Sequence, residues 1–250
     1  MKLLIIQTGA TLPGLLKRHG DFPEWFRRGL GLKPEQIEIV RVDAQHPLPD
    51  ARGVDAAVIT GSGAMVSERL GWSERTAEWL RAAARQQLPI LGVCYGHQLL
   101  AHAFGGRVDY NPRGREIGTV DIERLGVAAD DPLLGSAPPR FRAHATHLQS
   151  VLKLPSDAVV LARSALDDCQ AVRFAPCVWG LQFHPEFTAA HMRGYITARE
   201  EMVEAEGLDA RALLATVEPA RHARGLLRRF VKVAAQSSAR KNKNGRAGRF

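Results

Sequence analysis

The chain has 250 residues, 45% of them apolar and 24% charged, which is typical of a globular protein with one large domain or a domain with an appendage. No apolar run approaches the roughly 18 to 20 residues of a membrane-spanning helix, and the amino-terminal aliphatic run is shorter than the about 7 to 15 residues of a signal peptide. The three cysteines, an odd number, favour free thiols in a reducing compartment. We therefore expect a cytoplasmic enzyme and no membrane association.

The net charge of +8 is unevenly distributed. Ten of the 34 Lys and Arg residues follow Glu218, beyond which there is no acidic residue, so residues 1–218 hold 24 basic and 26 acidic residues. The basic character belongs to the carboxyl-terminal end. An amphipathic helix is predicted at 219–233, and the tail after it is expected to be solvated. We expect no nucleic acid partner, because no recognised nucleic-acid-binding motif accompanies the charge.

Strand and helix patterns alternate through the first half of the chain. Apolar, β-branched runs predict strands, and helical periodicity between them predicts helices, with Ser73 as the N-cap of one. The predicted strands are Lys2–Gln7, Ile37–Val42, Val54–Thr60 and Pro89–Val93, and the predicted helices are Phe22–Leu30, Ser73–Gln87 and Gly96–Phe104. This alternation is typical of right-handed βαβ units in a mostly parallel sheet.

Short strands separated by turn signals follow, and we expect them to form antiparallel hairpins added to the parallel core. They are Glu116–Ile122, Arg140–His144, Ala158–Ser164, Gln170–Phe174 and Val178–Phe183. Helical patterns return over Thr188–Glu206 and Asp209–Ala235. These patterns predict a main domain at 1–205, a helical extension at 206–235 and a basic tail at 236–250 that is disordered because it has almost no core-forming residues.

Cys94 ends one predicted strand and precedes a predicted helix, between Gly92 and Gly96. Small residues two positions before and after a nucleophile let strand and helix approach closely at a sharp turn, as in the G-x-S-x-G elbow, here with Cys in place of Ser. The amides that begin the helix would favour a thiolate. A buried strand cysteine between incidental glycines is the alternative, and this segment alone does not decide between the two.

The segment VWGLQFHPEF provides a base for that thiol. Pro185 ends the strand, so His184 and Glu186 point to the same side of the backbone. A nucleophilic thiol needs a histidine to hold its proton, and the histidine needs a carboxylate to fix its tautomer. A strand-end histidine satisfied by a carbonyl group is the better explanation of one histidine in isolation. The H-P-E order together with the cysteine elbow favours catalysis.

A third segment, Gly61-Ser62-Gly63, follows the predicted strand that ends at Thr60. It does not match the dinucleotide-binding pattern G-x-G-x-x-G, because Val66 occupies the position of the last glycine. Its amides and that of Tyr95 suit an oxyanion hole beside Cys94. An ordinary glycine-rich turn explains this segment equally well when it is taken alone.

Together, GVCYGHQLLA, GLQFHPEF and TGSG resemble the class I (triad-type) glutamine amidotransferases, with the nearest likeness to the glutaminase domain of GMP synthase. The resemblance covers about residues 2–190. It implies that Cys94 is the nucleophile, His184 the base and Glu186 its orienting partner, and that Gln98 helps to bind glutamine. With the strand and helix pattern, it leads us to expect a flavodoxin-like three-layer α/β sandwich with a mostly parallel central sheet and a small antiparallel patch.

The resemblance also implies an oxyanion hole formed by the amides of Gly61, Ser62 and Tyr95. GMP synthases usually have Gly-Gly-Pro in this loop, whereas Ser62 and Gly63 occupy the last two positions here. The segment NPRGREIG (residues 111–118) is similar instead to stand-alone members of the family, some of which hydrolyse γ-glutamyl peptides.

The segment ATHLQSV holds the residues that the resemblance places next to the substrate. Thr146, His147 and Leu148 would present mainly backbone atoms to the α-amino and carboxylate groups of glutamine. His144 and His147 are not expected to form a metal site, because no Cys or other ligand clusters with them. No metal and no cofactor is expected.

Three functions remain open. A glutaminase subunit would deliver ammonia to a separate synthetase, and a stand-alone hydrolase would act on γ-glutamyl peptides or amines. A non-catalytic binding or regulatory module is the third, against which the intact Cys-His-Glu set argues. Because neither an S-G-G-x-D-S pyrophosphatase loop nor a P-loop occurs in the sequence, we expect no GMP synthesis by this chain alone.

Overall fold

The computed structural model describes the backbone of residues 1–247 and the side chains of residues 1–239. Its strands are β1 (Leu3–Gln7), β2 (Ile37–Arg41), β3 (Ala56–Ile59), β4 (Ile90–Val93), β5 (Arg107–Tyr110), β6 (Glu116–Arg124), β7 (Arg140–His147), β8 (Gln149–Lys153), β9 (Val159–Arg163), β10 (Ala171–Ala175) and β11 (Val178–Leu181). Its α-helices are α1 (Pro13–His19), α2 (Phe22–Leu30), α3 (Gly71–Arg85), α4 (Tyr95–Ala103), α5 (Ala189–Ala198), α6 (Glu200–Ala205), α7 (Ala210–Ala215) and α8 (Arg221–Ala247).

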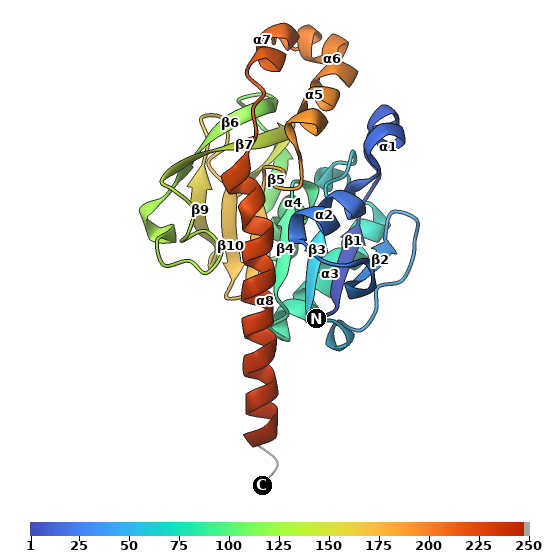
Figure 1. Cartoon of the computed structure of the whole chain (residues 1–250), viewed down its shortest axis with the longest axis vertical. Helices are drawn as coiled ribbons and strands as arrows, with labels where there is room; N and C mark the ends of the chain where they lie inside the picture. Colours follow the sequence, from blue (N-terminus) through green and yellow to red (C-terminus); the bar gives the residue numbers. More distant parts are fainter. Residues whose placement is uncertain (248–250) are drawn as a thin grey trace.

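Within the described residues, one nine-stranded sheet has the order β2-β1-β3-β4-β11-β10-β9-β6-β7, and β5 and β8 form a second, antiparallel pair. The first five strands of this order are parallel, and the remaining four continue the sheet in antiparallel pairings. The α/β class predicted from the sequence is confirmed. The antiparallel strands extend the parallel half at one side (Figure 1).

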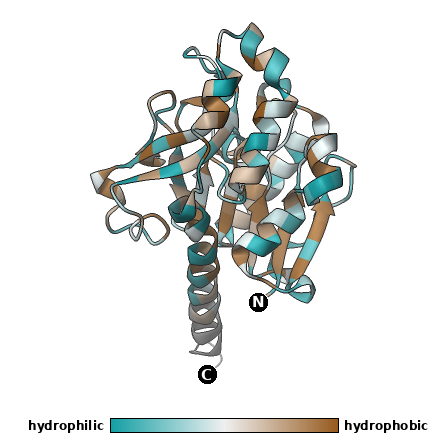
Figure 2. Cartoon of the chain, turned by 45° about the horizontal axis from the view of Figure 1, so that its top comes forward, coloured by the Kyte–Doolittle hydropathy of each residue, from teal (hydrophilic) through white to brown (hydrophobic). Residues whose placement is uncertain are grey.

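The central parallel strands β1, β3, β4 and β11 are buried on both faces, which explains their mainly apolar sequences, whereas the edge strand β2 is only partly buried. In β1, Leu3 and Ile5 pack with α2 and α8, whereas Leu4 and Ile6 pack with α3 and α4. Successive side chains of a strand point to opposite faces, so one run of aliphatic residues supplies both cores. In Figure 2 the strands of this half are largely hydrophobic, and the hydrophilic colours gather on the helices outside.

Helix α3 begins earlier than the sequence analysis predicted. Its N-cap residue is Leu70, whose carbonyl oxygen accepts from the amides of Ser73 and Glu74. The prediction of Ser73 as the N-cap is therefore wrong, and its buried hydroxyl accepts a hydrogen bond from the Tyr95 hydroxyl instead. Burial of Trp72 in the first turn contributes more than the about 1 kcal/mol of a side-chain cap.

The carboxyl-terminal helix α8 packs along the body and then extends beyond it (Figure 1). Leu226, Leu227 and Phe230 are buried against the same core as α2. The structure differs from the predicted boundary at residue 235, since the helix continues through Ala247, and residues 248–250 lie outside the described part. The docked part of the helix provides the nucleus from which residues 236–247 continue as helix, although Ser, Asn and Gly residues lie among their Ala, Lys and Arg residues.

Among the described residues, no helix combines the length and the apolar character needed to cross a membrane.

Candidate active site

Cys94 lies at the corner between β4 and α4, with φ of 52° and ψ of −105°. Residues other than glycine rarely adopt such a backbone conformation. A Cβ atom on Gly92 would collide with the carbonyl group of Gly96, and one on Gly96 would lie 2.7 Å from the carbonyl oxygen of Ile59. Both glycines are therefore required sterically, because the strand and the helix approach too closely for a side chain. This is the geometry of a nucleophile elbow.

His184 and Glu186 follow β11, the neighbour of β4 in the sheet. The two groups form a buried hydrogen bond of 2.7 Å between His184 Nδ1 and Glu186 Oε1. The His184 amide donates to the carbonyl oxygen of His144 at 2.7 Å, and the Phe187 ring stacks on the imidazole with centroids 4.2 Å apart. Nε2 of His184 bonds to no oxygen or nitrogen atom among the described residues, so it is available to exchange a proton with Cys94 or with a reacting group.

Gly61 shows how closely these segments converge. A Cβ atom placed on it would lie 3.0 Å from Cε1 of His184 and 3.7 Å from Cβ of Cys94. The three residues follow β3, β4 and β11, which are adjacent parallel strands. The carboxyl ends of such strands lie at one edge of the sheet, where open α/β sheets bind ligands.

The electrostatics of the site favour a thiolate–imidazolium pair. Burial alone would raise the pKa of the Cys94 thiol, but the adjacent His184 outweighs that effect and lowers it. For His184, burial alone would lower the pKa, whereas the charges of Glu186 and Cys94 raise it to about 10. Each partner thus stabilises the charged form of the other.

The loop after β3 presents unpaired amides next to the thiol. The amides of Gly61, Ser62 and Tyr95 donate to no acceptor among the described residues. The Ser62 hydroxyl donates to the carbonyl oxygen of Thr8 at 2.7 Å and accepts from the amide of Ala64 at 3.1 Å. The side chain of Ser62 therefore fixes the loop, and its backbone stays available to an oxyanion.

The segment that ends β7 lies on another side of Cys94. The Cys94 sulfur is 4.0 Å from the carbonyl oxygen of Thr146. The amide group of Gln98 donates to the carbonyl oxygen of Gln149 at 2.7 Å and to Oε1 of Gln182 at 3.0 Å. Gln98 thus ties helix α4 to this segment, while its side chain also lines a cavity beside the thiol.

Two small cavities, of about 50 and 60 Å3, flank Cys94. Five residues line both cavities: Cys94, Ser62, Gly63, Thr146 and Arg199. The first cavity is also lined by His184 and Tyr195. The second is also lined by Tyr95, Gln98, Arg115, His147 and Leu148. Every predicted site residue except Gly61 and Glu186 lines one of them. Sequence reasoning did not identify Tyr195, Arg199 or Arg115. Helical periodicity carried no signal for the first two, whereas Arg115 lies in the segment NPRGREIG.

His147, which lines the second cavity, belongs to a buried polar network. Its Nε2 lies 3.0 Å from Oε2 of Glu116, and its Nδ1 lies 3.0 Å from the carbonyl oxygen of Gln149. Burial alone would lower the pKa of His147, but Glu116 and Asp167 raise it. Within the described part of the chain, no group of three or more His, Cys, Asp and Glu residues is arranged to hold a metal ion.

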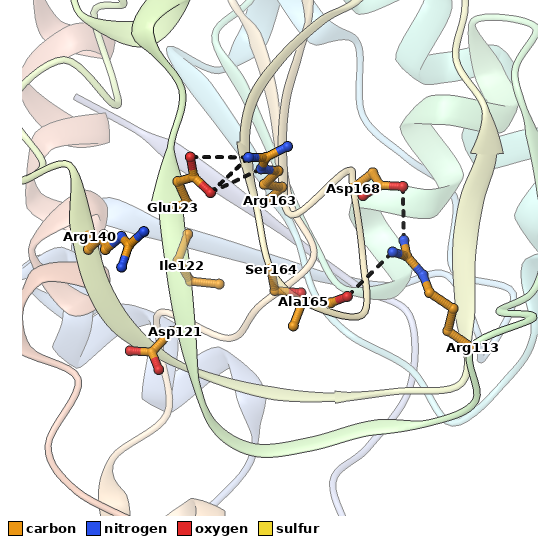
Figure 3. Close-up of a pocket in the computed structure, with 9 residues that line it drawn as sticks. All are labelled: Arg113, Asp121, Ile122, Glu123, Arg140, Arg163, Ser164, Ala165 and Asp168. Atoms are coloured by element: carbon orange, nitrogen blue, oxygen red, sulfur yellow. Dashed lines mark hydrogen bonds and ion pairs between the residues drawn. The ribbon is translucent and has the colours of Figure 1, made fainter.

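A larger cavity, of about 550 Å3, lies in the antiparallel half and shares no residue with the two cavities at Cys94 (Figure 3). It is lined mainly by charged side chains, four of which form ion pairs with one another. Arg163 contacts Glu123, and Arg113 contacts Asp168 and the carbonyl oxygen of Ala165. Because no nucleophile–base pair lies among these residues, this cavity is not the candidate active site.

The sequence of the chain is similar to those of known proteins. The family model described as "Glutamine amidotransferase class-I" matches residues 20–202. The glutamine-hydrolysing GMP synthase subunit of Methanopyrus kandleri is 31% identical over 175 residues, which cover 69% of this chain and 87% of that protein. The glutamine-hydrolysing GMP synthase of Aeropyrum pernix is 36% identical over 160 residues, 64% of this chain but only 29% of that longer protein.

The fold of the chain is similar to the folds of solved glutamine amidotransferases. A glutamine amidotransferase from Thermotoga maritima has a TM-score of 0.71 at 22% identity, covering 93% of this chain and 97% of that one. A glutamine amidotransferase from Methylobacillus flagellatus has a TM-score of 0.72 at 26% identity, covering 92% of this chain and 94% of that one.

Proposed function

Because the chain belongs to the class I glutamine amidotransferase family, we propose that it hydrolyses the side-chain amide of glutamine to glutamate and ammonia through Cys94, His184 and Glu186. The observation that carries this proposal is the Cys94 thiol at positive φ beside an imidazole whose other nitrogen is bonded to a buried carboxylate. Such an arrangement supplies a nucleophile, a base and an orienting group in reach of one another.

The reaction begins with attack of the Cys94 thiolate on the side-chain carbonyl carbon of glutamine. The amides of Gly61, Ser62 and Tyr95 stabilise the negative charge that develops on the carbonyl oxygen. Protonated His184 donates a proton to the leaving ammonia, and a thioester to Cys94 remains. His184 then removes a proton from water, which attacks the thioester, releases glutamate and restores the thiolate–imidazolium pair.

We further propose that the ammonia serves a separate synthetase. The likeness to separate subunits of glutamine-hydrolysing GMP synthases supports this, because the chain covers 87% of the one from Methanopyrus kandleri. Hydrolysis of free glutamine is then expected to rise when the synthetase partner is added.

A second candidate keeps the same chemistry but takes a γ-glutamyl peptide or amine as substrate without any partner. It is favoured by the segment NPRGREIG, which brings Arg115 to the cavity that also contains Gln98. A non-catalytic binding module remains the third function, and the arrangement of Cys94, His184 and Glu186 argues against it.

The test is a comparison of substrates by the purified chain. Ammonia and glutamate release would be measured with L-glutamine and with a panel of γ-glutamyl peptides and amines, in the presence and absence of the synthetase partner. Preference for glutamine with stimulation by the partner supports the first proposal, whereas a strong preference for a γ-glutamyl peptide or amine supports the second. Absence of hydrolysis of every compound contradicts both.

A further inference from the structure

Arg199 links helices α5 and α6 and lies over the candidate active site. It is one of the few residues that line both cavities at Cys94, and it is only partly exposed. No sequence motif marked it. Its position raises the question of what a cation does beside the nucleophile.

Two contacts hold the Arg199 side chain in place. Its Nη1 donates to Oγ1 of Thr146 at 2.8 Å, and its guanidinium carbon lies 5.0 Å from the ring centroid of Tyr195. The Tyr195 hydroxyl is itself hydrogen-bonded to Oγ1 of Thr11 at 2.9 Å. Among the described residues, Nε and Nη2 of Arg199 have no hydrogen-bond partner, so one edge of the guanidinium is unoccupied.

The neighbouring Arg115 provides a contrast within the same cavity. Arg115 contacts both carboxylate oxygens of Glu206, at 2.7 and 2.9 Å, so its charge is compensated. Arg199 has no carboxylate within 4.0 Å in the described part of the chain. Burial lowers the pKa of Arg199, which reflects the cost of a largely desolvated cation without an anionic partner.

The charge of Cys94 attracts Arg199, but His184 is the group that mainly compensates the thiolate, so Arg199 still lacks a carboxylate partner. The α-carboxylate of a γ-glutamyl substrate would be such a partner. A short aliphatic chain separates that carboxylate from the carbonyl carbon under attack, and Arg199 and Cys94 line the same cavities. A planar guanidinium binds a carboxylate through two parallel hydrogen bonds, for which Nε and Nη2 are available.

We propose that Arg199 binds the α-carboxylate of the substrate and restricts the site to γ-glutamyl compounds in which this carboxylate is free. This inference rests on the proposed function. It adds a cation to the neutral backbone groups of residues 146–148, with which Arg199 is already connected through Thr146.

The kinetic test compares L-glutamine with L-glutamine α-amide, in which a neutral amide replaces the charged α-carboxylate. The full chain is expected to prefer L-glutamine by roughly 100-fold in kcat/KM, a range typical of a charge-assisted pair. Arg199→Gln is expected to raise the KM for L-glutamine and to remove most of this preference, with the α-amide affected less than about threefold, and Arg199→Lys should recover part of it. Equal losses on both substrates would overturn the inference.

Arg193→Gln is the matched control. Arg193 is an exposed arginine of helix α5 whose Nη2 donates to the carbonyl oxygen of Val217, and it lines neither cavity at Cys94. Its substitution is expected to leave the preference between the two substrates unchanged. Loss of the preference in this variant would overturn the assignment to Arg199.

A binding measurement separates this inference from the proposed function. Calorimetric titration of L-glutamine into Cys94→Ala and into Cys94→Ala/Arg199→Gln needs no turnover, and roughly 100-fold weaker binding in the double variant supports the inference even when no hydrolysis occurs. Equal binding, or no binding of L-glutamine to Cys94→Ala, overturns it. Alkylation of Cys94 by iodoacetamide should be at most about threefold slower in Arg199→Gln than in the unaltered chain; alkylation slower by about tenfold or more would assign Arg199 to the thiolate and overturn the inference.

Discussion

The imidazole of His184 is joined to the carboxylate of Glu186 by a hydrogen bond of 2.7 Å, and both side chains are buried. Both residues lie in a short segment after β11. The backbone of this segment is fixed by a hydrogen bond from the His184 amide to the carbonyl oxygen of His144. The bond to Glu186 uses Nδ1, so Nε2 is the nitrogen left for chemistry. The orientation of the base therefore follows from local sequence, whereas its proximity to Cys94 follows from the sheet order.

Replacement of His184 by Ala is expected to reduce kcat/KM by at least about 100-fold and to shift thiol reactivity to higher pH. In the unaltered chain the Cys94 pKa lies below its ordinary value of 9.0, and that of His184 is about 10. Without the histidine, burial is the dominant effect on the thiol and raises its pKa. Rates of iodoacetamide alkylation between pH 6 and 10 measure the shift. Coincident pH profiles of the two proteins would contradict the pairing.

Gly96→Ala is expected to destabilise the fold by about 1–3 kcal/mol and to reduce activity, because the new Cβ would lie 2.7 Å from the carbonyl oxygen of Ile59. Gly225→Ala is the matched control, since a Cβ there meets no atom within 4 Å in helix α8. That substitution should stabilise by about 0.5–1 kcal/mol. Urea denaturation measures both changes. Equal stability of Gly96→Ala and the unaltered chain would show that the elbow is not sterically constrained.

His97 makes the fold sensitive to acid. It is fully buried, and burial lowers its pKa from 6.5 to about 3. Because the folded-state pKa lies below the unfolded one, the stability contribution is complete above pH 6.5 and declines as the pH falls toward 3. His97→Leu should reduce the loss of unfolding free energy between pH 7.5 and 5.5 by about 1.4 kcal/mol. Urea denaturation at both pH values measures this loss. The same loss of unfolding free energy in His97→Leu and in the unaltered chain would contradict the explanation.

Removal of residues 236–250 is expected to leave glutamine hydrolysis within about twofold of the full chain. The buried contacts of α8 end near Ala234, and Leu226, Leu227 and Phe230 all precede the cut. Removal of residues 221–250 would expose that apolar core and eliminate the hydrogen bond from Arg224 to the carbonyl oxygen of Glu186, so this protein should unfold or lose activity. Activity assays and thermal denaturation compare the two truncations. Full activity without residues 221–250 would contradict the role given to α8.

The centre of the parallel half was predictable because β1, β3, β4 and β11 are mainly apolar runs, whereas the edge strand β2 also contains Glu38 and Arg41. Helix Phe22–Leu30 begins and ends where the sequence indicates, since Asp21 caps it and Gly31 ends it in the left-handed conformation. The start of α3 was not predictable from capping residues, because the burial of Trp72 decides it. The continuation of α8 past residue 235 depends on the docked part of the helix, which local composition does not reveal.

Of the candidate site, the residues that lie in short motifs could be predicted, and those contributed by distant helices could not. Cys94, His184 and Glu186 carry their signals in glycine and proline neighbours. Arg199 and Tyr195 reach the cavity only because α5 packs over the edge of the sheet, and one sequence contains no signal for that packing.

The central claim is that Cys94 attacks a γ-glutamyl amide. Release of glutamate and ammonia from L-glutamine by the full chain, measured beside Cys94→Ala, tests it most directly. The account predicts steady hydrolysis by the unaltered chain and none by the variant, with closely similar circular dichroism and thermal denaturation of both proteins. Hydrolysis by Cys94→Ala at the rate of the unaltered chain would contradict it.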